Sequence, residues 1–104
     1  MGLANLQRYY SVSLKLMLEL DLEKRAERFL EKLPKKHAAQ IARKLLLLLE
    51  DPYPSDSKLL HGVSLHRLDS GEYRVIYRVE RKTLEVYLVG RRNDGEVYRK
   101  LDRL

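Results

Sequence analysis

The sequence contains no cysteine. This absence excludes disulfide bonds and thiolate nucleophiles, and it leaves three histidines as the only soft ligands for a metal ion. His37, His61 and His66 do not have the spacing of a zinc site. We therefore expect neither a metal ion nor any other cofactor.

Long hydrophobic runs are also absent. The longest uninterrupted apolar stretch covers only residues 45–49, whereas a membrane-spanning helix needs roughly 18 or more such residues. The first residues lack a basic segment followed by an apolar core and a small-residue cleavage site, so the sequence does not indicate export. We expect a cytoplasmic protein.

The chain is basic and short. With 104 residues it has room for one domain around a single modest core. Lys and Arg number 21 against 15 Asp and Glu, which gives a formal net charge of +6. This surplus favours an anionic partner, with nucleic acid first and an acidic protein or a membrane surface behind it.

The hydrophobic period changes along the first half of the chain. Residues 13–20, SLKLMLEL, alternate between apolar and other residues and predict a strand with one covered face. Asp21 is a candidate N-cap for an amphipathic helix, and Pro34 either ends this helix or opens the second helix that follows. Residues 50–58, with two prolines, predict a loop. The apolar stripes contain Leu22, Ala26, Phe29, Leu30 and Leu33 in the first helix and Ala38, Ile41, Ala42, Leu45, Leu46 and Leu49 in the second.

Three short strand patterns fill the second half, at residues 63–68, 73–80 and 83–89. The last ten residues return to helical spacing through Val97, Leu101 and Leu104. Together these patterns predict an α+β fold: an N-terminal strand, a two-helix hairpin, a three-stranded antiparallel meander and a short C-terminal helix.

Tight turns between these strands fix which residues face one another. A turn centred on residues 70–71 sets Arg67 opposite Arg74, and a turn centred on residues 81–82 sets Arg78 opposite Glu85. Two like charges that face each other across a sheet repel, which is locally unfavourable. A phosphate bound between the two guanidiniums would make the arrangement favourable. One predicted face, suited to packing under the helices, carries Tyr73, Val75, Tyr77, Val79, Leu84, Val86 and Leu88, with Val75 opposite Leu88; the other carries Arg67, Arg74, Arg78, Glu85 and Tyr87.

The segment GRRNDGEVYRK places two adjacent arginines shortly before Tyr98. Strict alternation puts Arg91 on the face of Arg74, and a bulge at Gly90 would put Arg92 there instead, so either arginine is a candidate. The same alternation points His66 toward the core face.

This order of elements resembles the RelE/ParE superfamily of bacterial and archaeal type II toxins. The resemblance covers about residues 18–101 and is densest in RAERFLEKLPKK, GEYRVIYRVE and GRRNDGEVY. We therefore expect a single toxin domain over residues 1–104, in which residues 1–16 are a candidate N-terminal extension.

The resemblance implies a ribosome-dependent mRNA endonuclease. In members similar to RelE, the substrate 2′-hydroxyl attacks the adjacent phosphate in the ribosomal A site without a metal ion. Carried over position by position, the catalytic residues are Arg67, Arg74, Arg92 and Tyr98, and further RNA contacts are expected at Arg91, Lys35, Lys36 and His66. Fixed guanidiniums can stabilise the negative charge that builds on five-coordinate phosphorus. Nearby cations also favour the phenolate form of Tyr98, which could act as a general base or stack on a nucleobase.

The resemblance also implies partners and leaves other functions open. The partners are a cognate antitoxin protein, which makes a hetero-oligomer, together with mRNA and ribosomal RNA. Leu65 stands where RelE has a basic residue, and it can neither donate a proton nor bind phosphate. This departure supports a catalytically idle module that binds an antitoxin, and a ParE-like poison of DNA gyrase, which shares the fold but needs no nuclease site, is a further alternative.

Overall fold

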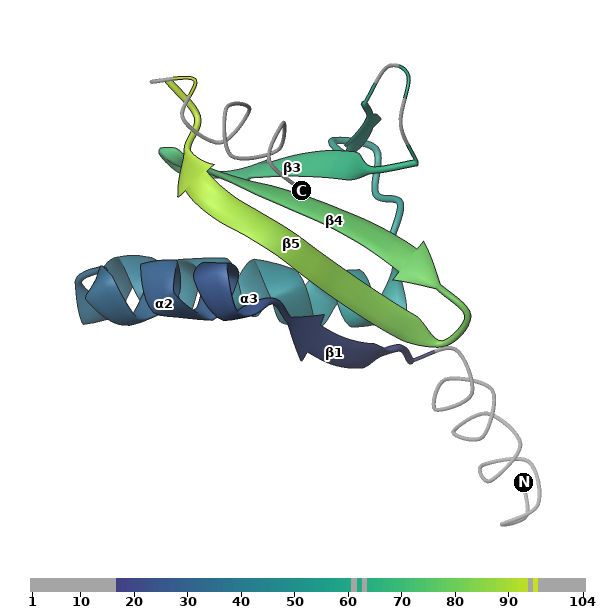
Figure 1. Cartoon of the computed structure of the whole chain (residues 1–104), viewed down its shortest axis with the longest axis horizontal. Coiled ribbons are helices and arrows are strands. Elements are labelled where there is room, and N and C mark those ends of the chain that lie inside the picture. Colours follow the sequence, from purple (N-terminus) through teal and green to yellow (C-terminus); the bar gives the residue numbers. More distant parts are fainter. Residues whose placement is uncertain (1–16, 61, 63, 94, 96–104) are drawn as a thin grey trace, which may run out of the picture.

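The computed structural model describes residues 17–60, 62, 64–93 and 95. They form a five-stranded sheet with two helices along one of its faces (Figure 1). The elements are β1 (Glu19–Leu22), α2 (Lys24–Lys32), α3 (Lys35–Glu50), β2 (Lys58–Leu59), β3 (His66–Ser70), β4 (Tyr73–Glu80) and β5 (Thr83–Arg91). The predicted α+β class is confirmed, whereas the C-terminal helix predicted over Val97, Leu101 and Leu104 lies outside the described residues.

The sheet has the strand order β1-β5-β4-β3-β2. Strands β2 to β5 pair antiparallel as the predicted meander requires, and β1 pairs parallel with β5. Strand β2 forms where the sequence predicted the end of a loop, and it adds an edge beside β3. No helix in the described part of the chain is long and apolar enough to span a membrane.

The strand-to-helix junction differs from the prediction. The N-cap of α2 is Glu23, and Asp21 lies inside β1, opposite Glu85 of β5. The backbone N–H of Glu23 donates to the carbonyl of Val86, so pairing with β5 continues to the first turn of the helix. Pro34 is the N-cap of α3, as expected of a residue that cannot continue a helix.

The core lies between the helices and the sheet. Helix α3 buries Ile41, Leu45, Leu48 and Leu49, which recur at the offsets of one helical face. The predicted stripe was wrong at its edges, because Leu46 is 58% exposed and Leu48 is buried. The helices and strands together bury Ala26, Ile41, Leu45, Leu48, Leu49, Leu68, Tyr73, Val75, Tyr77, Leu84, Val86 and Val89.

The hairpin between β3 and β4 turns at Gly71 and Glu72, one residue later than predicted. Gly71 has φ +59°, and a Cβ there would meet the side chain of Gln40 at 3.3 Å, so glycine suits this turn. Asp69, and not Arg67, therefore faces Arg74. The prediction that Arg67 and Arg74 face each other was wrong. The observed register differs from the predicted one by two residues, an even number, so Arg67 still lies on the same face as Arg74.

The hairpin between β4 and β5 turns at Arg81 and Lys82 as predicted. The predicted pairs of Tyr77 with Val86, Arg78 with Glu85 and Val79 with Leu84 are confirmed.

Beyond these pairs, β5 contains a bulge, but not at Gly90, the position that the sequence interpretation considered. Tyr77 pairs with Val86 and Ile76 pairs with Leu88, so Tyr87 is the additional residue. Val75 therefore faces Val89, and Leu88 moves to the other face, where it packs with Ile76, Leu60, Leu65 and Tyr87. The prediction that Leu88 belongs to the helix-covered face was wrong.

Candidate functional site

Three arginines surround one carboxylate on the sheet face opposite the helices. The Nε and Nη2 atoms of Arg74 donate to the two oxygens of Asp69 at 2.7 and 3.2 Å. Nη1 of Arg92 lies 3.6 Å from Oδ2 of Asp69. Arg67 is two residues before Asp69 on β3 and so shares its face. We call these four residues the arginine cluster; it carries three positive charges and one negative charge.

The charge of the cluster stabilises the ionised form of Asp69. The hydrogen bond from Arg74 lowers the pKa of Asp69 most, and the charges of Arg74, Arg67 and Arg92 lower it further, against an opposing effect of partial burial. Bidentate contact with a carboxylate also fixes the plane of the Arg74 guanidinium. Arg74 is thereby oriented before any ligand binds.

A lysine that the sequence interpretation missed lies beside the cluster. Lys58 of β2 pairs with Arg67 of β3, and these two residues line a small cavity of about 70 Å³ with Asp56 and Asp69. Like charges opposite each other are unfavourable by roughly 0.2–1 kcal/mol, and a bound anion would remove that repulsion. No local pattern signalled this strand, because two residues are too few to show a hydrophobic period.

The bulge at Tyr87 separates the two adjacent arginines. Gly90 pairs with Arg74, and Arg92 lies two residues further along the chain, on the same face. The backbone N–H of Arg92 donates to the carbonyl of Glu72 at 3.0 Å. Arg91 pairs with Tyr73, and its guanidinium lies over the Tyr73 ring, 5.9 Å from the centroid. Of these two arginines it is Arg92 whose guanidinium lies near Asp69, and the bulge that places it there lies at Tyr87 and not at Gly90.

The other predicted site residues lie apart from the arginine cluster. Lys35 and Lys36 are exposed at the start of α3, and His66 faces Tyr77 on the helix-covered side. Leu65 packs against Ile76 and Leu88, so its apolar side chain has a packing role. Tyr98 lies outside the described residues. Roles in RNA binding for these residues stay predictions.

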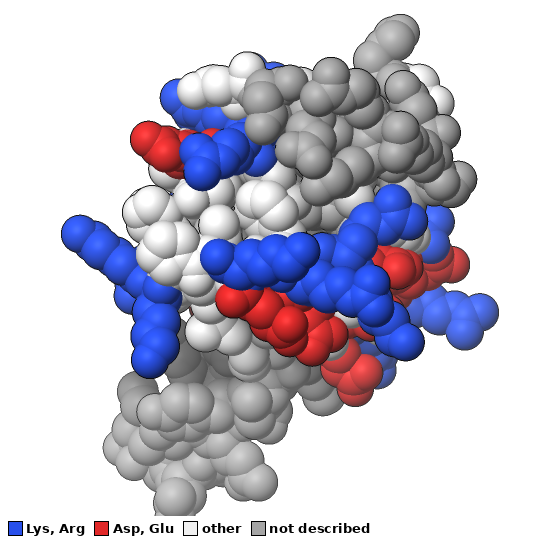
Figure 2. All heavy atoms as spheres, turned by 60° about the vertical axis from the view of Figure 1, so that its left-hand side comes forward, with Lys and Arg blue, Asp and Glu red and all other residues white. Residues whose placement is uncertain are grey.

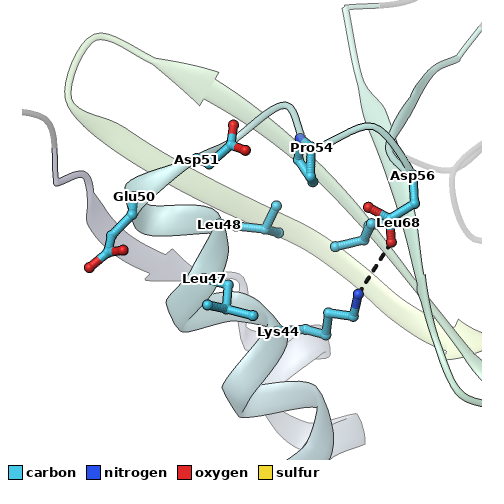
Figure 3. A pocket seen from close by; sticks show the side chains of 8 residues that line it. All are labelled: Lys44, Leu47, Leu48, Glu50, Asp51, Pro54, Asp56 and Leu68. Atoms are coloured by element: carbon cyan, nitrogen blue, oxygen red, sulfur yellow. Dashed lines mark hydrogen bonds and ion pairs between the residues drawn. The ribbon is translucent and has the colours of Figure 1, made fainter.

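A larger cavity, of about 270 Å³, does not suit a phosphate. It lies between the C-terminal end of α3, the segment that follows it and β3 (Figure 3). Its lining contains three carboxylates and one ammonium group, and that ammonium, of Lys44, already pairs with Asp56 at 3.2 Å. The residues are Lys44, Leu47, Leu48, Glu50, Asp51, Pro54, Asp56 and Leu68.

Charges of both signs are interspersed on the surface. Figure 2 shows Lys and Arg side chains beside Asp and Glu side chains across one side of the molecule. Within the residues that the structure describes, no three His, Asp or Glu side chains come together as ligands for a metal ion. The arginine cluster is thus the arrangement best suited to an anionic ligand.

Acid should weaken the fold through Asp69. Its folded-state pKa is below the ordinary value of 3.8, so the stabilisation from its ionised form is present above about pH 4 and is lost as the pH falls through the folded-state value. We expect the free energy of unfolding to fall below about pH 4 less steeply in Asp69→Asn than in the wild type. Urea unfolding at a series of pH values measures this, and parallel profiles would contradict it.

The comparison with protein families decides the classification. The matching family is described as the ParE toxin of the type II toxin-antitoxin system, parDE, and the match covers residues 20–95. The chain is a type II toxin of the RelE/ParE superfamily. The predicted family membership is confirmed, and the toxin's arginine cluster falls entirely inside the matched segment.

Solved structures similar to the toxin carry the name RelE. A free form of the Escherichia coli toxin RelE, with two arginines replaced by alanine, is 29% identical with a TM-score of 0.71, covering 85% of this chain and 98% of that one. RelE from the RelE–RelB complex of Pyrococcus horikoshii OT3 is 27% identical with a TM-score of 0.68, covering 75% and 98%.

The intact E. coli RelBE toxin-antitoxin complex contains a chain that is 30% identical with a TM-score of 0.61, covering 71% of this toxin and 95% of that chain. Curated protein sequences gave no significant match.

Proposed function

We propose that this toxin is a ribosome-dependent endonuclease that cuts mRNA in the A site. The observation that carries the proposal is the arginine cluster, in which Asp69 holds Arg74 and Arg92 together on the sheet face that the helices leave uncovered. The superfamily's nuclease chemistry needs fixed cations around one phosphate, and this cluster supplies them without a metal ion.

The cluster supports a division of roles along the RNA backbone. The substrate 2′-oxygen loses its proton and forms a bond to phosphorus while the bond from phosphorus to the 5′-oxygen breaks. The departing 5′-oxygen takes up a proton from water, which leaves a 2′,3′-cyclic phosphate and a 5′-hydroxyl end. Arg74 and Arg92 neutralise the charge that develops on the non-bridging oxygens. Lys58 and Arg67, which face each other across β2 and β3, hold a neighbouring phosphate. Tyr98 takes the proton of the 2′-hydroxyl or stacks on a base.

An antitoxin protein is the second part of the proposal. The similar toxins from P. horikoshii and E. coli were solved in complexes with RelB or as RelBE. We infer that this toxin likewise binds a cognate antitoxin, which covers the arginine cluster and prevents access to mRNA.

The test is translation with purified ribosomes, followed by mapping of mRNA ends by primer extension. We expect the toxin to produce new ends inside the A-site codon when ribosomes are present. A reaction that holds the same mRNA without ribosomes is the control, and we expect it to stay uncut. Intact mRNA in both reactions would contradict the proposal.

Poisoning of DNA gyrase is a second candidate. It is favoured by the match to the family described as ParE, and Leu65 at a position where RelE is basic agrees with it. A supercoiling assay with purified gyrase separates the two candidates. Loss of supercoiling with accumulation of cleaved DNA, while mRNA stays intact, would establish the second candidate.

A further inference from the structure

A second surface site lies at the end of the sheet where β3 begins. It is a cavity of about 310 Å³ lined by Tyr53, Leu59, Ser64, His66, Arg78 and Val79. Pockets for small molecules start at roughly 300 Å³. We propose that this cavity binds one nucleobase of the mRNA; the proposal rests on the proposed function and adds to it a means of choosing the base.

Aromatic rings form one wall of the cavity. The His66 ring contacts Tyr53, which also lines the cavity, with centroids 4.8 Å apart, and Tyr77 behind the lining, with centroids 5.7 Å apart and planes 30° from parallel. Tyr53 is 54% exposed, although it is a large aromatic residue. Single-stranded RNA is recognised by stacking of unpaired bases on such rings. The wall therefore offers the flat surface that a base requires.

Two polar atoms at this wall have unused hydrogen-bonding capacity. Among the described residues, Nδ1 of His66 and Nε of Arg78 are buried without a partner. The Nη2 atom of Arg78 is already engaged by Glu80 at 2.8 Å and Glu85 at 3.0 Å, whereas its Nε atom has no partner. Buried polar groups are normally satisfied. A base edge, with its ring nitrogens and exocyclic groups, carries donors and acceptors of the kind that both atoms lack.

The cavity is adjacent to the arginine cluster along one ladder. Lys58 pairs with Arg67, and the next pair along the ladder is Leu59 with His66. The β3–β4 ladder ends at the pair of His66 with Tyr77, and Arg78, on the same face as Arg74, lines the cavity beyond that end. The cavity therefore lies at the end of the sheet next to the cluster, with Leu59, His66 and Val79 on the helix-covered face and Arg78 on the face of the cluster. Lys58 and Leu59 are adjacent on β2, the edge strand of the sheet, so a nucleotide with its phosphate at Lys58 and Arg67 would reach the cavity with its base around this edge.

Nucleotide binding can be tested without ribosomes. The labelled toxin is titrated with each of the four nucleoside 5′-monophosphates, and the ring signals of His66 and Tyr53 are followed by NMR. Ribose 5-phosphate is the matched control because it lacks only the base. We expect saturable shifts of both rings with at least one nucleotide in the millimolar range and none with ribose 5-phosphate. Absence of ring shifts with all four nucleotides, or equal shifts with ribose 5-phosphate, would overturn the proposal.

A pair of substitutions tests the same site during cleavage. We expect Tyr53→Ser to lower A-site cleavage about tenfold at the favoured codons, the loss typical of one stacked base, and to reduce the differences between codons. Tyr53→Phe keeps the ring and should retain the wild-type profile, and Leu46→Ala is a control for removal of an exposed apolar side chain elsewhere.

The two proposals fail separately. A Tyr53→Ser toxin that is folded and has the wild-type rate and codon profile would refute the base site but not the nuclease. Failure of the wild type itself to cut mRNA would refute the nuclease, and the NMR titration would still decide whether the cavity binds a base.

Discussion

Replacement of Arg92 by alanine is expected to slow A-site cleavage by about 100- to 1,000-fold, the usual effect of removing one preorganised donor from a developing negative charge. Arg92 reaches Asp69 and shares its face with Arg74. The adjacent Arg91→Ala makes the same change of charge and size on the other face, over Tyr73. We expect Arg91→Ala to retain a rate close to that of the wild type.

The comparison of these variants depends on both staying folded. The Arg92 side chain is 45% exposed, and its backbone hydrogen bond to Glu72 does not depend on the side chain. Thermal unfolding of Arg92→Ala should therefore be close to that of the wild type. Equal losses of cleavage in Arg91→Ala and Arg92→Ala would show that net charge matters and would contradict a specific role for Arg92.

The largest expected effect on stability comes from Leu45. This residue is 2% exposed and packs between α3 and the sheet, so Leu45→Ala removes buried methyl groups and leaves a cavity. We expect the free energy of unfolding to fall by about 2–5 kcal/mol. Chemical denaturation monitored by circular dichroism measures it.

The neighbouring leucine provides a matched control. Leu46 is 58% exposed on the same helix, and alanine is the better helix former, so Leu46→Ala should change the free energy of unfolding by about 0.5 kcal/mol or less. Similar losses in Leu45→Ala and Leu46→Ala would contradict the orientation of α3. The outcome would then also weaken the assignment of the sheet face that carries the arginine cluster.

The difference between these two leucines shows what the sequence could not predict. The period of apolar residues was sufficient to predict helix α3, but the five consecutive leucines at 45–49 do not reveal which of them face the sheet. The packing of the helix decides this. Leu48, which the predicted stripe omitted, is 1% exposed, and Ala42, which the stripe included, is exposed.

The sequence was sufficient to predict most residues of the candidate site, but not how they contact one another. Arg67 and Arg74 lie on one face as the alternation predicted, but the turn at Gly71 gives Arg74 the partner Asp69. The contribution of Lys58 could not be derived from local pattern, because a two-residue strand has no period to detect. Alternation alone also could not show whether Arg91 or Arg92 shares the face of Arg74. The bulge at Tyr87 interrupts the alternation, and a tyrosine does not mark a bulge in a sequence.

The bulge has a consequence for comparisons between related toxins. The residue pairs on both sides of Tyr87 are already in register with β4, so a chain one residue shorter at this point could keep Leu88, Val89 and Arg92 on their present faces. A deletion elsewhere in the strand would exchange them. Sequence alignments should therefore place a length difference at Tyr87. An alignment without a gap there would equate Arg92 with a residue on the opposite side of a related sheet.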